Sequence, residues 1–579
     1  MYQALGGAAR AAGLLTLANT AGAMLGPLLA GFVLLPRLGM ERSVFALSAA
    51  YAAVALCAAG PRGLAAPSRA GLVALAACAA ALALFPFGRM DEAYLGRVVG
   101  RLVGRGERVV AVREGLLETI VYARTDWLGE PLVLHLVTNG FSMSATDPPS
   151  ERYMSLFVQI PAALHPAPRE ALLISFGVGT TAAALTDLSS LETIDVVDIS
   201  PEIVEGAELV FPDPAANPLR DPRVRVHVED GRYFLHATRR RYDLITSEPP
   251  PPAFAGVVNL YTQEYFALLR SRLAEGGWAS YWLPVVQLAE REAQAIVRAF
   301  CAVFPDCSAW EGTPQNWILL GSRGATGPLP EAQLGRWFED PRAGARLRRV
   351  GVEQVEQLDT LLLADAPALA EWVGDVPPLV DDHPGRAPRP AAAWSRVPEG
   401  YARLLDAGRA RSRFARSRWV QERWPARLRE ATLAFFPLRG LATEQQLRRK
   451  ASFRVGAVVH VLERTRLHTL ALWLLGSSPV EQEIAERVRA RGERSAATGY
   501  HLAVRALADR DFALAADRFE ALPRGSVGQP LQDPAHVLAL CLAGRPAAAQ
   551  RRLRELAEEP ARAGPEPAWA TWLRERFQL

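Results

Sequence analysis

Three apolar stretches near the N-terminus constrain this chain more than any other feature. No charged residue occurs in Ala11 to Pro36, Ser43 to Pro61 or Ala70 to Gly88, and an arginine closes each stretch at both ends. About 20 apolar residues cross a bilayer as a helix, and charge is kept out of lipid. A signal peptide alone would not be followed by two further long runs. We therefore predict a multi-pass transmembrane region over residues 1–90, with helices at about 11–36, 43–61 and 70–88.

Arginines set the expected orientation of this region. Arg97, Arg101, Arg105 and Arg108 follow the last apolar stretch. Because positive charge accumulates on the cytoplasmic side of a membrane, we expect the rest of the chain to be cytoplasmic. The net charge of only +4 over 579 residues excludes a dedicated nucleic-acid binder.

Cysteine usage argues against a metal centre. Cys301 and Cys307 are the close pair among five cysteines, and neither a second pair nor a nearby histidine completes a tetrahedral site. The count is also too low for a disulfide scaffold. We expect no metal and no permanently bound cofactor.

The segment after the membrane region changes pattern twice. Residues 105–150 alternate apolar and polar residues and are broken by turn residues, which predicts a small antiparallel β domain. In residues 151–325, short apolar runs alternate with helical segments, which predicts a mostly parallel α/β sheet of the Rossmann type with a ligand site at the carboxyl ends of its strands. The runs are Ala171 to Phe176, Thr193 to Val197, Val224 to Val228, Tyr242 to Thr246, Trp278 to Leu283 and Trp317 to Leu320.

A glycine turn follows the first of these runs. Gly177 and Gly179 precede a predicted helix, so the backbone can approach a ligand closely. Asp198 ends the second run about 20 residues later, a spacing typical of a carboxylate that binds a ribose diol. The pair indicates an adenosine-type ligand; a tight turn without a ligand is the alternative.

Two more carboxylates end later strands. Asp230, next to Gly231, is placed to accept a hydrogen bond from an adenine amino group, or to cap the following helix. Glu248 precedes four prolines, which hold it on a rigid extended segment at the mouth of the sheet. A carboxylate fixed there can act as a base or hold a cation.

The ordered landmarks of residues 153–283 resemble the spermidine synthase (polyamine aminopropyltransferase) family. They are Tyr153, Pro161, His165-Pro166, Gly177, Gly179, Asp198 to Pro201, Asp221 to Val224, Asp230 to Arg232, Tyr242-Asp243, Leu260 to Thr262 and Gly276-Gly277. Residues 18–23, 247–249, 255–260 and 381–384 are similar to a membrane-fused bacterial branch of that family, in which a major-facilitator-like region precedes the synthase domain. Here that region is short, and the resemblance implies the bacterial inner membrane.

The resemblance implies a methyltransferase-like Rossmann domain that transfers an aminopropyl group from decarboxylated S-adenosylmethionine to an amine acceptor. Asp198 would bind the ribose, Asp230 with Gly231 the adenine, and Gly177 with Gly179 the nucleoside. Glu248 would take the proton from the amine, and Tyr153 and Tyr261 would contact substrate. The family's carboxylates in the glycine turn and on the proline segment are replaced by Val178 and Pro251, and its His or Gln after the tyrosine by Met154. A doubly charged diamine would therefore lack partners.

The rest of the chain is predicted to be helical. Residues 326–400 form a helical extension, in which Asp381 to His383 reads as a solvated turn rather than a metal site. Residues 401–579 form a basic helical region with tetratricopeptide-like hairpins, repeated at a 35-residue offset between Asp509 and Gly544. The hairpins suggest protein contacts. Residues 401–456 carry 14 Lys/Arg against 4 Asp/Glu around Phe414, Trp419 and Trp424, which fits either a face on anionic lipid or a solvated helix.

The leading hypothesis is thus a membrane-anchored transferase acting on a small amine. One alternative is a nucleoside-binding sensor or scaffold that lost its amine site, which Val178 and Pro251 favour. The other is an NAD-dependent oxidoreductase, since the glycine turn with an acidic residue would serve there too. An oxidoreductase of this type would need a catalytic His, Cys or Tyr-Lys pair near the mouth of the sheet. The sole lysine, Lys450, is too far along the chain to supply such a pair there, which weakens this alternative.

Overall fold

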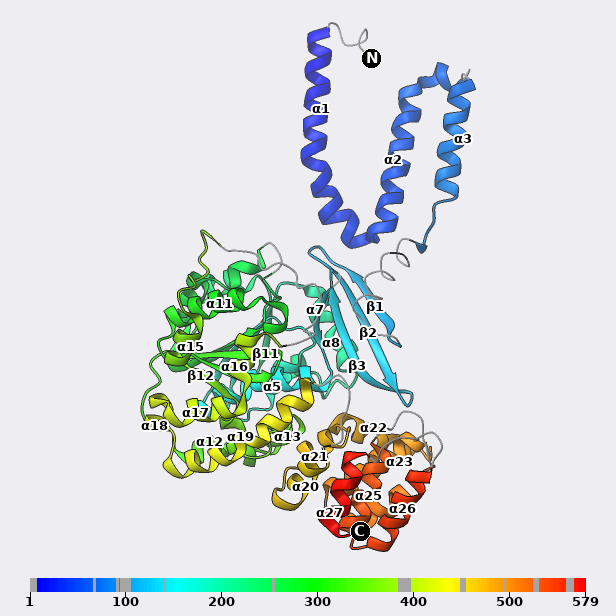
Figure 1. Cartoon of the computed structure of the whole chain (residues 1–579). Coiled ribbons are helices and arrows are strands. Elements are labelled where there is room, and N and C mark those ends of the chain that lie inside the picture. The colour runs from blue at the N-terminus through cyan, green and yellow to red at the C-terminus, as the bar shows by residue number, and fades with distance from the viewer. Residues whose placement is uncertain are drawn as a thin grey trace. The chain divides into compact units, whose positions relative to one another are not determined.

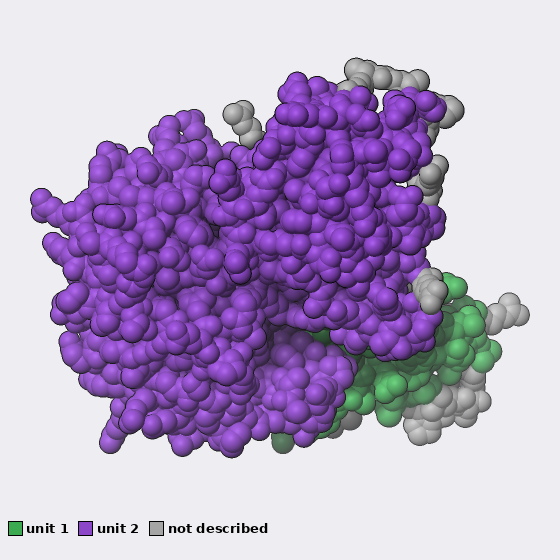
Figure 2. Space-filling view, turned by 90° about the horizontal axis from the view of Figure 1, so that it is seen from below, with its two compact units in different colours: residues 1–125, 134–144 green, residues 126–133, 145–579 purple. Residues whose placement is uncertain are grey.

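The computed structural model describes residues 8–65, 69–89, 93, 106–139, 141–252, 256–383, 397–447, 454–493, 495–523, 531–558 and 567–579. The chain divides into two compact units, coloured separately in Figure 2. The first comprises residues 1–125 and 134–144, and the second comprises residues 126–133 and 145–579.

The N-terminal helices differ from the predicted arrangement. Helix α1 (Ala8–Leu29) continues through the π-helical turn η2 (Ala30–Leu34) into α2 (Leu35–Ala65), and α3 (Arg69–Ala83) follows. Figure 1 shows the helical chain turning sharply between α1 and α2, where the π-helical turn and the positive φ of Gly39 (+74°) interrupt the regular helix.

The prediction of three separate membrane spans is wrong. Among the described residues, one helical stretch, Arg10–Cys57, is long and apolar enough to cross a membrane, and the apolar helix Gly71–Ala83 is shorter. The expected loop between the first two spans is absent because Arg37, Glu41 and Arg42 lie within α2. Of the arginines used to predict orientation, Arg97, Arg101 and Arg105 lie outside the described residues.

The small β domain forms as predicted. Its sheet has the strand order β1-β2-β3-β4, and β1 pairs with β2 in antiparallel fashion. Leu128 and Gly129 both have positive φ, as a two-residue hairpin turn requires. The strands are β1 (Arg108–Glu114), β2 (Thr119–Trp127), β3 (Glu130–Thr138) and β4 (Phe141–Ala145).

The large sheet confirms the predicted α/β architecture, and all six apolar runs lie in its strands. Its order is β12-β10-β11-β9-β8-β5-β6-β7, parallel from β9 to β7 and antiparallel from β12 to β9. The eighth strand, β12, falls in the stretch expected to be purely helical. The strands are β5 (Glu170–Ile174), β6 (Thr193–Asp198), β7 (Val224–Val228), β8 (Tyr242–Ser247), β9 (Leu273–Leu283), β10 (Ser308–Thr313), β11 (Asn316–Ser322) and β12 (Leu362–Asp365).

Helices cover this sheet, and aromatic side chains fill the space beneath them. Tyr261, Tyr265, Phe266, Tyr281 and Trp317 are fully buried in one cluster. The covering helices are α5 (Pro148–Leu164), α6 (Thr180–Thr186), α7 (Pro201–Glu205), α8 (Ala207–Val210), α9 (Gly231–Ala237), α10 (Gln263–Ser271), α11 (Glu290–Val303), α12 (Glu331–Glu339), α13 (Pro341–Arg349), α14 (Val355–Asp359) and α15 (Ala366–Val373), with short 3-10 turns at Pro218–Arg220, Val257–Leu260 (η4) and Val285–Gln287.

One covalent link was not foreseen. Cys301 near the end of α11 and Cys307 before β10 form a disulfide with an S–S distance of 2.07 Å. The described part of the chain holds no group of three or more metal-ligand side chains that could bind a metal ion.

The basic segment packs its aromatic side chains inward, contrary to the lipid-face interpretation. Phe414 and Trp424 are buried. The buried guanidinium of Arg423 lies between the rings of Trp278 and Trp419, 5.5 and 5.6 Å from their centroids. The helices of this segment are α16 (Glu399–Leu405), α17 (Ala407–Arg416), α18 (Arg418–Arg423) and α19 (Ala426–Leu447).

The turns within the C-terminal helical hairpins repeat every 34 residues, one fewer than the predicted 35-residue offset. Gly476, Arg510 and Gly544 have φ of +71°, +65° and +70°. At each turn the following amide donates to a carbonyl five residues back, from Ser477, Asp511 and Arg545, at 2.9 Å. The helices are α20 (Val455–Arg464), α21 (His468–Leu474), α22 (Pro479–Ala490), α23 (Ala496–Ala508), α24 (Phe512–Glu520), α25 (Gln532–Leu542), α26 (Pro546–Glu558) and α27 (Ala568–Phe577). The two predicted hairpins are therefore joined by a third, α21 with α22.

Candidate active site

The glycine turn after β5 is a tight left-handed corner. Gly177 and Gly179 have φ of +57° and +78°, and Ser175 has φ +76°. A Cβ on Gly179 would lie 2.6 Å from the ring of Phe176 and 2.9 Å from that of Phe211. Glycine is therefore required at 179 by both conformation and space, and α6 begins directly after it.

Asp198 ends β6 beneath this corner and is almost fully buried. Its carboxylate accepts hydrogen bonds from the backbone N–H of Phe176 at 2.7 Å and of Ser200 at 2.9 Å. Burial raises the pKa of Asp198 above its ordinary value. Hydrogen bonds from the backbone N–H groups of Ser200, Phe176, Gly177 and Ile199 offset part of that rise. The structure thus brings Asp198 and the glycine corner together, as predicted from their spacing.

Asp230 lies one strand further along the same edge. Glu229 donates its backbone N–H to the carbonyl of Asp198 at 3.0 Å, which fixes β7 beside β6. The side chain of Asp230 accepts from the N–H of Tyr233 at 2.8 Å and caps α9. A Cβ on Gly231 would lie 2.5 Å from Cγ2 of Ile174, so this glycine lets α9 approach β5.

Glu248 follows β8 and faces the first turn of α6. Its backbone N–H donates to the carbonyl of Ile174 at 3.1 Å. Its Oε2 accepts a hydrogen bond from the hydroxyl of Thr181 at 3.2 Å, and Tyr153 provides a second side-chain hydrogen bond. Burial raises the pKa of Glu248 to about 8, against the lowering effect of these two donors.

Tyr153 and Tyr261 form the aromatic wall around this carboxylate. The ring of Tyr153 on α5 stacks on Trp282, with centroids 6.1 Å apart and an interplanar angle of 6°. The hydroxyl of Tyr261 lies 3.2 Å from the carbonyls of Pro249 and of Pro250, so it holds the proline segment in place. Burial, and then the charge of Glu248, raise the pKa of both tyrosines, which therefore stay neutral donors.

The positions that depart from the family pattern are uncharged and buried. Val178 is fully buried, Met154 is 1% exposed, and Pro251 lies in the proline segment beyond Glu248.

Asp381 is held by two side chains from other parts of the chain. It accepts hydrogen bonds from Nη1 of Arg232 at 2.9 Å and from the hydroxyl of Thr262 at 2.7 Å. Arg232 follows Gly231 on α9, and Thr262 follows Tyr261. These contacts therefore tie the end of the helical extension to the turn at Gly231 and to the segment that carries Tyr261.

Three residues of this region were missed in the sequence. Thr181 was visible in the glycine turn, where a hydroxyl on the first turn of a helix can reach a carboxylate. Trp282 and Arg232 gave no local signal, because their partners Tyr153 and Asp381 are 129 and 149 residues away along the chain.

Comparisons with known proteins find similarity over the segment that holds this site. Residues 150–311 match the model of the spermine/spermidine synthase domain. A polyamine aminopropyltransferase of Lachnoclostridium phytofermentans is 30% identical over 234 residues, 39% of this chain and 78% of the relative. That of Streptococcus pneumoniae is 34% identical over 175 residues, 29% of this chain and 60% of the relative, so this chain spans about three fifths of its length.

Solved structures are similar at lower identity. The spermidine synthase from Thermotoga maritima is 19% identical, covering 38% of this chain and 74% of its own, with a TM-score of 0.33. A probable spermidine synthase from Corynebacterium glutamicum is 16% identical, covering 50% of this chain and all of its own, with a TM-score of 0.33.

Proposed function

The chain belongs to the polyamine aminopropyltransferase family, and from this premise we propose that it transfers an aminopropyl group from decarboxylated S-adenosylmethionine to an amine. The observation that carries this proposal is Glu248, a carboxylate whose pKa is raised to about 8 at the end of a central strand. It faces two neutral hydroxyl donors, Tyr153 and Thr181. A base with a pKa near the working pH is suited to accept the proton of an attacking amine.

The reaction balances with the residues present. The amine nitrogen attacks the methylene next to the sulfonium, the carbon–sulfur bond breaks, and the thioether leaves with the electron pair. The proton lost from the amine passes to Glu248. Holding donor and acceptor together contributes the rest of the rate enhancement.

We assign the nucleoside to the edge formed by β5, β6 and β7. Gly177 and Gly179 would admit it closely, Asp198 would accept from the ribose hydroxyls, and Asp230 with Gly231 would meet the adenine. Asp198 already accepts backbone hydrogen bonds, and a carboxylate has lone pairs left for a diol. Tyr153 and Tyr261 would enclose the transferred group.

The acceptor that the residues around Glu248 favour carries a single basic amine. One carboxylate, Glu248, can pair with one ammonium group, and Val178, Met154 and Pro251 offer no partner to a second. Burying an unpaired charge costs several kcal/mol. The aromatic wall instead suits an apolar substituent on the amine.

We also propose that the helical stretch Arg10–Cys57 anchors the enzyme to a membrane, in keeping with the resemblance to a membrane-fused branch and with a cytoplasmic catalytic domain. Its length and composition support this. Recovery of the full chain in the detergent phase, and of a chain from residue 106 in the aqueous phase, would support the anchor. Equal partitioning of both would refute it.

Turnover of the purified full chain tests the enzymatic proposal. Decarboxylated S-adenosylmethionine is offered with putrescine or with a monoamine of similar length, and the released thioether nucleoside is measured. We expect product with the monoamine, slower turnover with putrescine, and loss of turnover in Glu248→Gln. Nucleoside binding without turnover of any amine would favour the sensor alternative, which Val178 and Pro251 support, and tight NADH binding would favour the oxidoreductase.

A further inference from the structure

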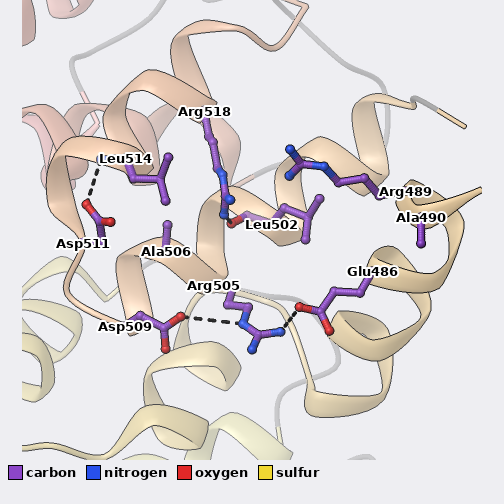
Figure 3. Close-up of a pocket in the computed structure, with 10 residues that line it drawn as sticks. All are labelled: Glu486, Arg489, Ala490, Leu502, Arg505, Ala506, Asp509, Asp511, Leu514 and Arg518. Carbon is purple, nitrogen blue, oxygen red and sulfur yellow. Dashed lines mark hydrogen bonds and ion pairs between the residues drawn. The ribbon is translucent and has the colours of Figure 1, made fainter. Parts of the chain in front are cut away.

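A hollow on the C-terminal repeats is unrelated to the proposed chemistry. It has a volume of about 660 Å³ and lies over α22, α23 and α24 (Figure 3). We call it the repeat groove. Its lining residues are Glu486, Arg489, Ala490, Leu502, Arg505, Ala506, Asp509, Asp511, Leu514 and Arg518.

The acidic side chains of the repeat groove already have partners. Arg505 pairs with Glu486 and, at 3.6 Å, with Asp509. Asp511 caps α24 by accepting from the N–H of Leu514 at 3.0 Å. These groups set the shape of the groove, and its other two arginines form no ion pair with the described residues.

Arg489 and Arg518 are those two arginines. Arg518 donates to the backbone carbonyl of Leu502 at 2.7 Å, a neutral acceptor. Burial lowers the pKa of Arg518, and the positive charges of Arg489 and Arg505 lower it further, against the raising effect of the Asp511 and Asp509 carboxylates. The side chain of Arg489 is exposed and forms no hydrogen bond or ion pair with the described residues, and in Figure 3 its guanidinium points into the groove. An incoming carboxylate would relieve this repulsion.

The rest of the lining selects the kind of anion. Leu502, Ala506 and Leu514 form an apolar floor, and Leu514 is 39% exposed. A continuous polyanion such as nucleic acid or an anionic lipid surface would also meet Glu486, Asp509 and Asp511 along the groove. A short segment that alternates carboxylates with an apolar side chain meets the arginines and the floor together.

We propose that the repeat groove binds an acidic polypeptide segment of a partner protein, whose carboxylates pair with Arg489 and Arg518 and whose apolar side chain packs on Leu502 and Leu514. The site is independent of the aminopropyl transfer. Its place on a helical-hairpin array gives it a rigid frame, because each repeat packs on its neighbours.

Peptide selection on the full chain tests this assignment. Two pools of random decapeptides are offered to the detergent-solubilised protein, one with glutamate fixed at two positions three residues apart and the other with glutamine there. We expect enrichment of the glutamate pool, and a roughly tenfold loss of affinity for selected peptides in Arg489→Gln and in Arg518→Gln, as for one charge-assisted hydrogen bond each. Arg554→Gln, at an exposed arginine of α26 outside the groove, is the matched control.

The possible results distinguish an acidic peptide from a polyanion as the ligand of the repeat groove. The side chain of Arg489 forms no hydrogen bond or ion pair with the described residues, so its variant should retain the wild-type melting temperature and report binding alone. Equal enrichment of both pools, or binding that is unchanged in both groove variants, would overturn the proposal. Arg489-dependent retention of phosphatidylglycerol vesicles or of single-stranded DNA, without peptide enrichment, would also overturn it and assign the groove to a polyanion.

Discussion

The carboxylate of Glu248 accepts a hydrogen bond from the hydroxyl of Thr181 at 3.2 Å, which joins the end of β8 to the first turn of α6. This contact places the proposed base within one helical turn of the glycine corner. The two halves of the proposed reaction, nucleoside binding and proton transfer, are thus held by neighbouring strands of one sheet.

Replacement of the proposed base should stop the chemistry without removing the nucleoside. We expect Glu248→Gln to reduce kcat by about 100- to 10,000-fold, the range that general bases contribute. The dissociation constant of the nucleoside should stay within a factor of about two. Glu264→Gln on the exposed start of α10 serves as control. Full activity of Glu248→Gln would remove this residue as the base.

The raised pKa of Glu248 also predicts how activity depends on pH. The residue accepts a proton only when ionised, and its pKa is about 8. The rate should therefore rise with pH up to about 8 and level off above it. A rate that is flat between pH 6 and 8 would contradict this assignment.

The same shift predicts a pH dependence of stability. A carboxyl group whose pKa is higher in the folded chain than in the unfolded chain favours folding at low pH. That contribution is lost as pH rises from about 4.5 to about 8, by at most about 1.4 kcal/mol per pH unit. Melting temperatures of the wild type and Glu248→Gln should therefore diverge over this interval, with the variant the less sensitive to pH.

Gly231 should be intolerant of a methyl group for one identifiable reason. A Cβ there would lie 2.5 Å from Cγ2 of Ile174, and such overpacking costs about 1–3 kcal/mol. Ile174→Ala removes that carbon and should recover part of the loss in a double-mutant cycle measured by chemical unfolding. Ile174→Val keeps Cγ2 and should recover none of it. Additive behaviour of both pairs would show that the contact is not the cause.

The repeat turns make a prediction about backbone conformation alone. Gly544 has φ +70° and no atom within 4 Å of a built Cβ, so Gly544→Ala should cost about 1 kcal/mol. Gly335 lies inside α12, also without a close neighbour. Gly335→Ala should stabilise the chain by up to about 1 kcal/mol. Melting temperatures that move in the same direction would contradict this account.

Much of the fold could be predicted because its signals are local. Apolar runs such as Thr193 to Val197 act within a few positions and were found as strands where expected. β12 was missed because Leu362–Asp365 is too short to show a strand pattern among helices. The third repeat was missed because the equivalent turn positions, Gly476, Arg510 and Gly544, share one backbone geometry but are not all the same residue.

The site residues also divide into those that a local sequence pattern reveals and those that only the tertiary fold brings together. Gly177, Gly179 and Asp198 are linked by a spacing that one supersecondary unit fixes, so they could be recognised together. Trp282 and Arg232 act through partners brought close by the tertiary fold. The membrane region was misjudged because hydropathy reads the length of an apolar run, whereas the helix continues through the charged residues Arg37 and Glu41.

The central claim is tested most directly by calorimetric titration of the full chain with decarboxylated S-adenosylmethionine, for the wild type and Asp198→Ala. The account predicts one saturable site in the wild type and at least a tenfold weaker one in the variant, as expected for loss of hydrogen bonds to a charged group. Asp213→Ala, at an exposed loop position, should bind as the wild type does. Absence of binding to the wild type, or equal affinity in Asp198→Ala, would contradict the account.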